Sequence, residues 1–142
     1  MTTDDRLAAA WEYAHRYYRD PQVEAEFELL SRFQPEVFTS YMSMRSGLFR
    51  EPPDGALDAR TKELVILGME CMGRKTNPPP TGHARKAIEA GATPQEVSEV
   101  VGLSIMLGGM ITFRESGRFV LREAVDHAER LRAGPAADAD ES

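Results

Sequence analysis

The sequence predicts an all-α protein of about six to seven helices. Helix start and stop signals recur along the whole chain, whereas strand signals are nearly absent. No alternation of apolar and polar residues reaches a useful strand length, and no Asn-Gly or Asp-Gly hairpin is flanked by strand-like runs. The length of 142 residues matches one domain with a single core, which we expect over residues 1–131.

Each of the first three helices begins at a cap or a proline. The expected starts are, in order, Asp4 or Asp5, Asp20-Pro21 and Pro35. An acceptor side chain fits a start because the first turn leaves backbone amides unpaired, and proline fits because it has no amide hydrogen. Apolar residues then recur at three- and four-residue spacing, which predicts helices over residues 5–18, 21–30 and 35–48.

Four more helices are predicted in the rest of the chain, over residues 59–73, 82–90, 94–108 and 111–131. Asp58 and Thr81 are the expected caps of the first two, and Gly91 is an expected left-handed stop. The run from Thr93 to Glu96 is a capping box with proline at the first helical position. Between these helices, three prolines within residues 74–80 disfavour a helix.

Charge and cysteine content indicate the compartment and exclude some partners. The chain has 17 basic and 23 acidic residues, a net charge of −6, which argues against a nucleic-acid or membrane-surface partner. Several acids fall in residues 132–142, which we expect to form a disordered acidic tail. The single cysteine fits a reducing, cytoplasmic location. Residues 100–113, which include Met106 and Met110, carry no charge. This stretch is shorter than the roughly twenty apolar residues that a bilayer span needs, so we expect it to form a buried helix.

No cofactor or metal is predicted. The sequence has no glycine-rich phosphate loop, no HExxH pair, no CxxC pair and no serine nucleophile elbow. Its three histidines, at positions 15, 83 and 127, lack the spacing of metal ligands.

The acid–base candidates lie on two successive helices. Arg60, Glu63 and Glu70 fall along roughly one face of the helix over residues 59–73. His83 begins the next helix, where the helix dipole favours a neutral imidazole. A neutral imidazole beside a carboxylate is a competent general base. The alternative is that Glu63 and Arg60 form a surface ion pair and that His83 is an ordinary first-turn residue.

One cysteine and one pair of arginines allow two interpretations each. Cys71 fits a small buried residue, whereas an activated thiolate would need a cationic neighbour such as Arg74 or His83. Arg114 and Arg118 lie one helical turn apart and could hold a substrate carboxylate. Glu115 beside them makes a solvated ion-pair face an equal alternative.

Four motifs, in the same order and at similar separations, resemble one known family. They are LDARTKELV at residues 57–65, GHARKA at 82–87, AGATPQEV at 90–97 and MLGG at 106–109. The amphipathic helix over residues 35–48 is similar to the lead-in of that family. The resemblance covers about residues 33–127, and the family is that of carboxymuconolactone decarboxylase, which includes the AhpD-type alkylhydroperoxidases.

The resemblance implies an AhpD-like helical bundle, assembled as a homotrimer or homohexamer, with a cofactor-free pocket between helices. The recurrent acid and histidine of the family fall on Glu63 and His83. The peroxidase branch carries a C-x-x-C-x-x-x-H motif, whose cysteine positions are Thr76 and Pro79 in this chain. Neither residue can relay electrons, so dithiol peroxidase activity is not expected.

The expected function is cofactor-independent decarboxylation of a small carboxylated lactone or a related unsaturated carboxylic acid. His83 would donate or accept the proton and Glu63 would orient it or relay protons, while Arg60, Arg74 and Arg114 are candidates for holding the substrate carboxylate. One alternative is a proton-transfer isomerase or hydratase with the same residues. Another is a non-catalytic, oligomeric binding or assembly protein.

Overall fold

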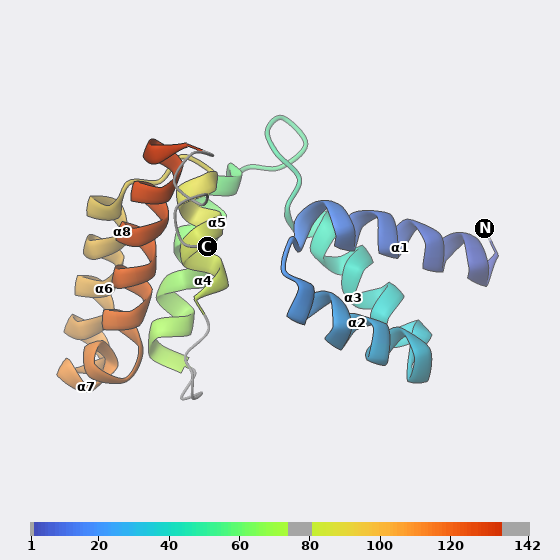
Figure 1. Cartoon of the computed structure of the whole chain (residues 1–142), viewed down its shortest axis with the longest axis horizontal. Helices are drawn as coiled ribbons and strands as arrows, with labels where there is room; N and C mark the ends of the chain where they lie inside the picture. The colour runs from blue at the N-terminus through green and yellow to red at the C-terminus, as the bar shows by residue number, and fades with distance from the viewer. Residues whose placement is uncertain (1, 74–80, 135–142) are drawn as a thin grey trace, which may run out of the picture. The chain divides into compact units, whose positions relative to one another are not determined.

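The computed structural model describes residues 2–73 and 81–134, and their regular structure is entirely helical, as predicted. The elements, labelled in Figure 1, are α1 (Thr3–Tyr17), α2 (Pro21–Phe33), α3 (Pro35–Leu48), α4 (Ala59–Gly73), α5 (Gly82–Glu89), α6 (Pro94–Gly108), α7 (Met110–Thr112), the π-helical turn η1 (Phe113–Gly117) and α8 (Arg118–Ala133). None of these helices has the length and hydropathy needed to cross a membrane.

The chain divides into two compact units, unit 1 (Met1–Gly55) and unit 2 (Ala56–Ser142). A single domain over residues 1–131 stays a prediction. The helix α8 continues through Ala133 and is capped by Gly134, and residues 135–142 of the expected acidic tail lie outside the described residues.

In unit 1, α3 packs against both α1 and α2. The core consists of four buried side chains, Ala10, Ala14, Phe38 and Met42. The start of α1 differs from prediction, because Thr2 rather than an aspartate is the cap. The Thr2 hydroxyl accepts from the amide of Asp5 at 3.1 Å, and the Asp5 carboxylate accepts from the amide of Thr2 at 2.8 Å.

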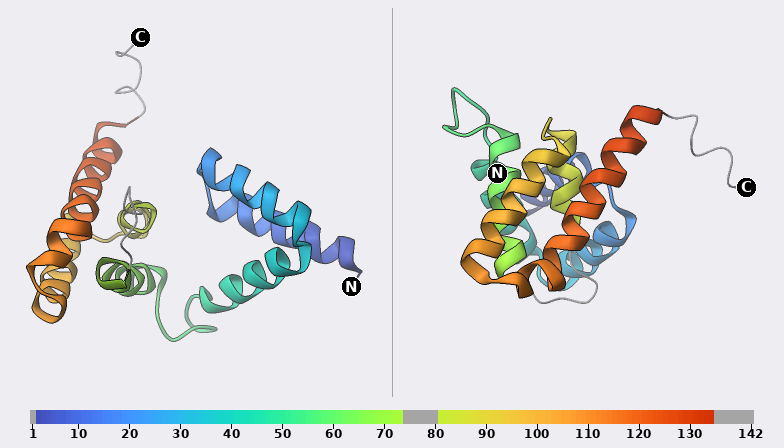
Figure 2. Two further views of the ribbon diagram at one scale, coloured as in Figure 1. Left: turned by 90° about the horizontal axis from the view of Figure 1, so that it is seen from below. Right: turned by 90° about the vertical axis from the view of Figure 1, so that its left-hand side faces the viewer.

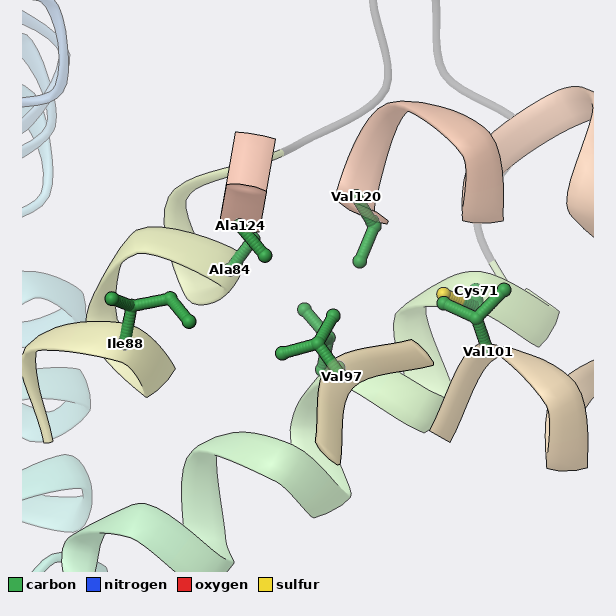
Figure 3. Packing of buried hydrophobic residues seen from close by; sticks show 8 residues of the cluster. Cys71, Ala84, Ile88, Val97, Val101, Val120 and Ala124 are labelled. Atoms are coloured by element: carbon green, nitrogen blue, oxygen red, sulfur yellow. The ribbon is translucent and has the colours of Figure 1, made fainter. Parts of the chain in front are cut away.

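In unit 2, four helices enclose one core. The helix α4 packs against α5 and α6, and α8 packs against the same two helices. Figure 2 shows α4 and α5 end-on and side by side, next to α6 and α8. The buried side chains, most of them labelled in Figure 3, are Leu67, Cys71, Ala84, Ile88, Val97, Val101, Val120 and Ala124. Each fully buried leucine or valine contributes about 1.5–3 kcal/mol relative to an exposed one.

The helix boundaries of unit 2 follow the local signals. Asp58 accepts from the amide of Thr61 at 2.8 Å, and this bond lowers the pKa of the Asp58 carboxyl. Thr93 and Glu96 form both hydrogen bonds of the predicted capping box. Gly91 has a φ of 97°, which confirms the left-handed stop after α5. Thr81 occupies the predicted cap position of α5, but its side chain makes no capping bond.

The last predicted helix, over residues 111–131, is interrupted. The chain forms α7, then the π-helical turn η1, and only then the long helix α8. A Cβ atom on Gly117, at the end of η1, would lie 2.8 Å from a Val101 methyl, so a larger residue here would require α6 or η1 to shift. The expected burial of residues 100–113 is wrong at Met106 and Met110, which are 71% and 59% exposed.

Candidate active site

An acidic residue lies on the buried face of α4. The buried positions of this helix are Glu63, Leu67 and Cys71, which recur every four residues. Glu63 is 2% exposed, as buried as its two apolar neighbours on that face. A carboxylate at a core position is costly unless it is hydrogen-bonded, so a partner for Glu63 is required.

His83, in the first turn of α5, provides that partner. Its Nδ1 atom lies 2.6 Å from Oε2 of Glu63, and the two side chains are 21% and 3% exposed. Ala84 and Ala87 are fully buried, and their small side chains allow α5 to approach its neighbours closely. Because an ionised carboxylate only accepts hydrogen bonds, we assign the proton of this short, charge-assisted bond to Nδ1 of His83.

A second carboxylate faces the opposite side of the same imidazole. Oε1 of Glu70, two turns after Glu63 on α4, lies 3.8 Å from Nε2 of His83. The Glu70 side chain is 11% exposed. Sequence spacing placed Glu70 on the same face as Glu63 but gave no reason to assign it a role. The structure therefore brings three titratable groups together, one histidine between two carboxylates.

Cys71 is next to Glu70 but belongs to the core. Its side chain is 3% exposed and packs within the cluster drawn in Figure 3. Burial, with a smaller contribution from the Glu70 charge, raises the pKa of the Cys71 thiol to about 11. The residue is thus a thiol at neutral pH, in agreement with the interpretation as a small buried residue.

Arg60 makes an ion pair that the sequence did not indicate. Its guanidinium binds the carboxylate of Glu96, the residue that completes the capping box of α6. The Thr93 amide and then the Arg60 guanidinium lower the pKa of the Glu96 carboxyl. The alternative of a surface pair between Arg60 and Glu63 is wrong, because Glu63 is buried against His83. Arg60 remains 40% exposed near the start of α4.

The other two predicted arginines are not part of this cluster. Arg114 lies in η1, where it lines a hollow of about 400 Å³ with Ile111, Glu115 and Arg118. Among the described residues, no hydrogen bond or ion pair joins the Arg114 side chain to Glu63 or His83. Arg74 lies outside the described residues, as do Thr76, Pro79 and the whole run of prolines from Pro78 to Pro80.

No other region of the described chain offers comparable chemistry. A hollow of about 500 Å³ in unit 1 is lined by α1 and α3, but its ten lining residues include no histidine and no acid. His15 and His127 bind single surface carboxylates, Glu24 at 2.9 Å and Glu89 at 3.1 Å. Within residues 2–73 and 81–134, no group of three or more His, Cys, Asp or Glu side chains has a geometry suited to a metal ion.

The fold and the site define a class of protein, namely a small helical protein with a buried carboxylate–histidine pair suited to moving protons. The sequence profile of the carboxymuconolactone decarboxylase family matches residues 35–123, which include all three members of the cluster. The chain belongs to this family.

One solved structure supports the assignment of the fold. It is that of a protein from Burkholderia xenovorans LB400 described as a candidate carboxymuconolactone decarboxylase. The two chains share 27% sequence identity and a TM-score of 0.76, over 93% of this chain and 98% of the Burkholderia protein. A comparison with functionally curated proteins gives no match.

Proposed function

We propose that the protein is a cofactor-independent carboxy-lyase that acts on a small carboxylated lactone or a related unsaturated carboxylic acid. The observation that carries the proposal is the 2.6 Å bond between Nδ1 of His83 and the buried Glu63 carboxylate. Such a bond fixes both the orientation and the tautomer of the ring, so Nε2 is the nitrogen left to exchange a proton with a substrate. Membership of the carboxymuconolactone decarboxylase family supports the choice of reaction.

The chemistry requires only groups that this chain supplies. When a carboxylate next to a conjugated carbonyl leaves as carbon dioxide, the electron pair of the broken C–C bond delocalises into the carbonyl. The resulting enolate-like carbon must then take up a proton. Nε2 of His83 takes up a proton from solvent and then transfers it to this carbon, while Glu63 stabilises the charged ring through Nδ1. Arg60, partly exposed at the start of α4, is a candidate for holding a substrate carboxylate.

The first experiment is a thermal-shift screen of mono- and dicarboxylic lactones and enoic acids, followed by turnover assays with mass detection of the product. A ligand that stabilises the wild type, and not His83→Ala, binds at the proposed site. Loss of one carbon dioxide supports decarboxylation, an unchanged mass indicates isomerisation, and a gain of one water indicates hydration.

The matched control is His127→Ala, which removes a histidine that binds a single carboxylate elsewhere in unit 2. We expect His83→Ala to lower turnover by about two to four orders of magnitude and His127→Ala to leave it nearly unchanged. Full activity in a folded His83→Ala variant would remove His83 from the mechanism. The absence of any ligand shift with both proteins folded would favour a binding or assembly protein.

A further inference from the structure

We propose that Glu63 and Glu70 have different roles around His83: Glu63 orients the ring, whereas Glu70 shares one transferable proton with Nε2 and renews it from solvent. This inference rests on the proposed function and adds a relay residue to it. Glu70 acts through His83, so we describe it as a positioning and relay residue rather than a catalytic one.

The two distances separate the two roles. The 2.6 Å contact between Nδ1 and Glu63 is a complete hydrogen bond, whereas the 3.8 Å separation between Nε2 and Glu70 is too long for one. Two atoms 3.8 Å apart can both form hydrogen bonds with a third atom that lies about 2.8 Å from each of them. The separation between Nε2 and Glu70 therefore matches a contact bridged by one water molecule, whereas Nδ1 and Glu63 bond each other directly.

Burial points in the same direction. The Glu63 side chain is 3% exposed, the Glu70 side chain 11% and the His83 side chain 21%, so the carboxylate on the Nε2 side of the ring is more accessible to solvent than the one on the Nδ1 side. A carboxylate sealed in the core can hold a ring in place but exchanges protons with water slowly. Glu70 is the more exposed of the two carboxylates, which suits a group that must be reprotonated in every turnover.

The charge of the cluster favours a retained proton. Two carboxylates beside a neutral imidazole would place two negative charges in a largely buried volume, and one shared proton halves that charge. The start of α5 opposes protonation, but a helix terminus carries only about half a unit charge.

The proposed cycle is balanced without an oxidant or a reductant. The bond between the substrate and its carboxylate breaks, carbon dioxide leaves, and the electron pair remains on the substrate carbon. A new C–H bond forms with the proton of Nε2, whose N–H bond breaks. Glu70, protonated from solvent, then returns a proton to Nε2, so the net reaction consumes one solvent proton and releases one carbon dioxide.

The test uses the full chain labelled with nitrogen-15 at histidine, and it requires no substrate. In the wild type we expect the Nε2 signal of His83 to reflect the proton that it shares with Glu70. In Glu70→Gln, which keeps the side-chain shape but removes the charge, the Nε2 signal should move towards the value of an unprotonated nitrogen, and Nδ1 should stay bonded to Glu63. The matched control is Glu89→Gln, which removes a carboxylate from His127 and should leave the His83 signals unchanged. An unchanged Nε2 signal in Glu70→Gln would overturn the proposal.

Kinetics with a substrate from the screen provide the second readout. We expect Glu70→Gln to lower kcat by about two orders of magnitude with little change in KM. A rise in KM at constant kcat would instead make Glu70 a substrate-binding residue and would overturn the relay. If Glu70→Gln does not fold, the second variant is Glu70→Asp, which keeps the charge and lengthens the distance from the carboxylate to Nε2. We expect this variant to retain the Nε2 proton with a reduced kcat. A wild-type kcat would contradict the relay.

The two proposals fail in different ways. Full turnover by His83→Ala would refute the proposed function, whatever the histidine signals show. Loss of turnover in His83→Ala, together with wild-type signals and kcat in Glu70→Gln, would leave the proposed function standing and remove only the relay.

Discussion

The bond between Glu63 and His83 can be measured without any substrate, by its contribution to stability. The perturbation is a double-mutant cycle of Glu63→Gln, His83→Ala and the two changes combined. In the wild type, His83→Ala removes the 2.6 Å bond from a carboxylate that is 3% exposed. In the Glu63→Gln background, the same change removes a partner from a neutral amide. The difference between the two costs isolates the charged interaction.

The structure sets the expected magnitude. Removing one partner of a buried charged pair lowers the free energy of unfolding by about 3–5 kcal/mol. His83 is itself 21% exposed, so water can enter the space that it leaves, and we take the lower end, about 3 kcal/mol. A stranded neutral group costs about 1 kcal/mol at the lower end of its range. The expected coupling free energy between Glu63 and His83 is therefore about 2 kcal/mol.

The assay is urea unfolding of the four proteins at one pH, with the free energy of unfolding obtained by linear extrapolation. The matched control is the same cycle on Glu89 and His127, where the carboxylate is 54% exposed and the coupling should stay below about 1 kcal/mol. A Glu63–His83 coupling below about 0.5 kcal/mol, which is within the usual error of additivity, would refute the reasoning.

Two further predictions concern the core of unit 2. The unfolded thiol of Cys71 loses its proton near its ordinary pKa of 9, whereas the folded thiol keeps it up to a pKa of about 11. The stability that this difference contributes is present below the unfolded pKa and is lost as the pH rises through the folded pKa. The wild type should therefore lose more stability than Cys71→Ala across this range. Parallel curves of unfolding free energy against pH would contradict the burial of the thiol. Leu67→Ala should cost about 2–5 kcal/mol, because Leu67 is completely buried on α4, and a loss below about 1 kcal/mol in urea unfolding would show that the core is packed differently.

Boundaries set by neighbouring residues were predictable from the sequence. The proline at position 21, the glycine at position 91 and the capping box of Thr93 each act through contacts within one turn of chain. The start of α1 was predicted at Asp4 or Asp5, but the cap is Thr2. Thr2 and Asp5 form a reciprocal capping box, and either residue type alone is a common cap. Local chemistry therefore fixes where these helices begin and end.

Contacts between distant residues were predictable only in part. Glu63 and His83 are 20 residues apart, and the resemblance to a family, rather than spacing, joined them. Arg60 and Glu96 are 36 residues apart, and spacing offered only the nearer acid, Glu63, as a partner for Arg60. Glu70 was on the correct face of α4, but its position opposite Nε2 depends on how α5 packs, which the sequence of α4 does not contain.

The uncharged stretch over residues 100–113 shows a further limit. Val101 and Met106 lie on the same helix, yet Val101 is 2% exposed and Met106 is 71% exposed. Apolar spacing predicts that a face is covered, but it does not distinguish a covering surface within unit 2 from one that belongs to a second copy of the chain. The expected homotrimer or homohexamer would supply such a surface, and it stays a prediction that light scattering can test. A monomer in solution would contradict it and would leave the apolar side chains of α6 without that explanation.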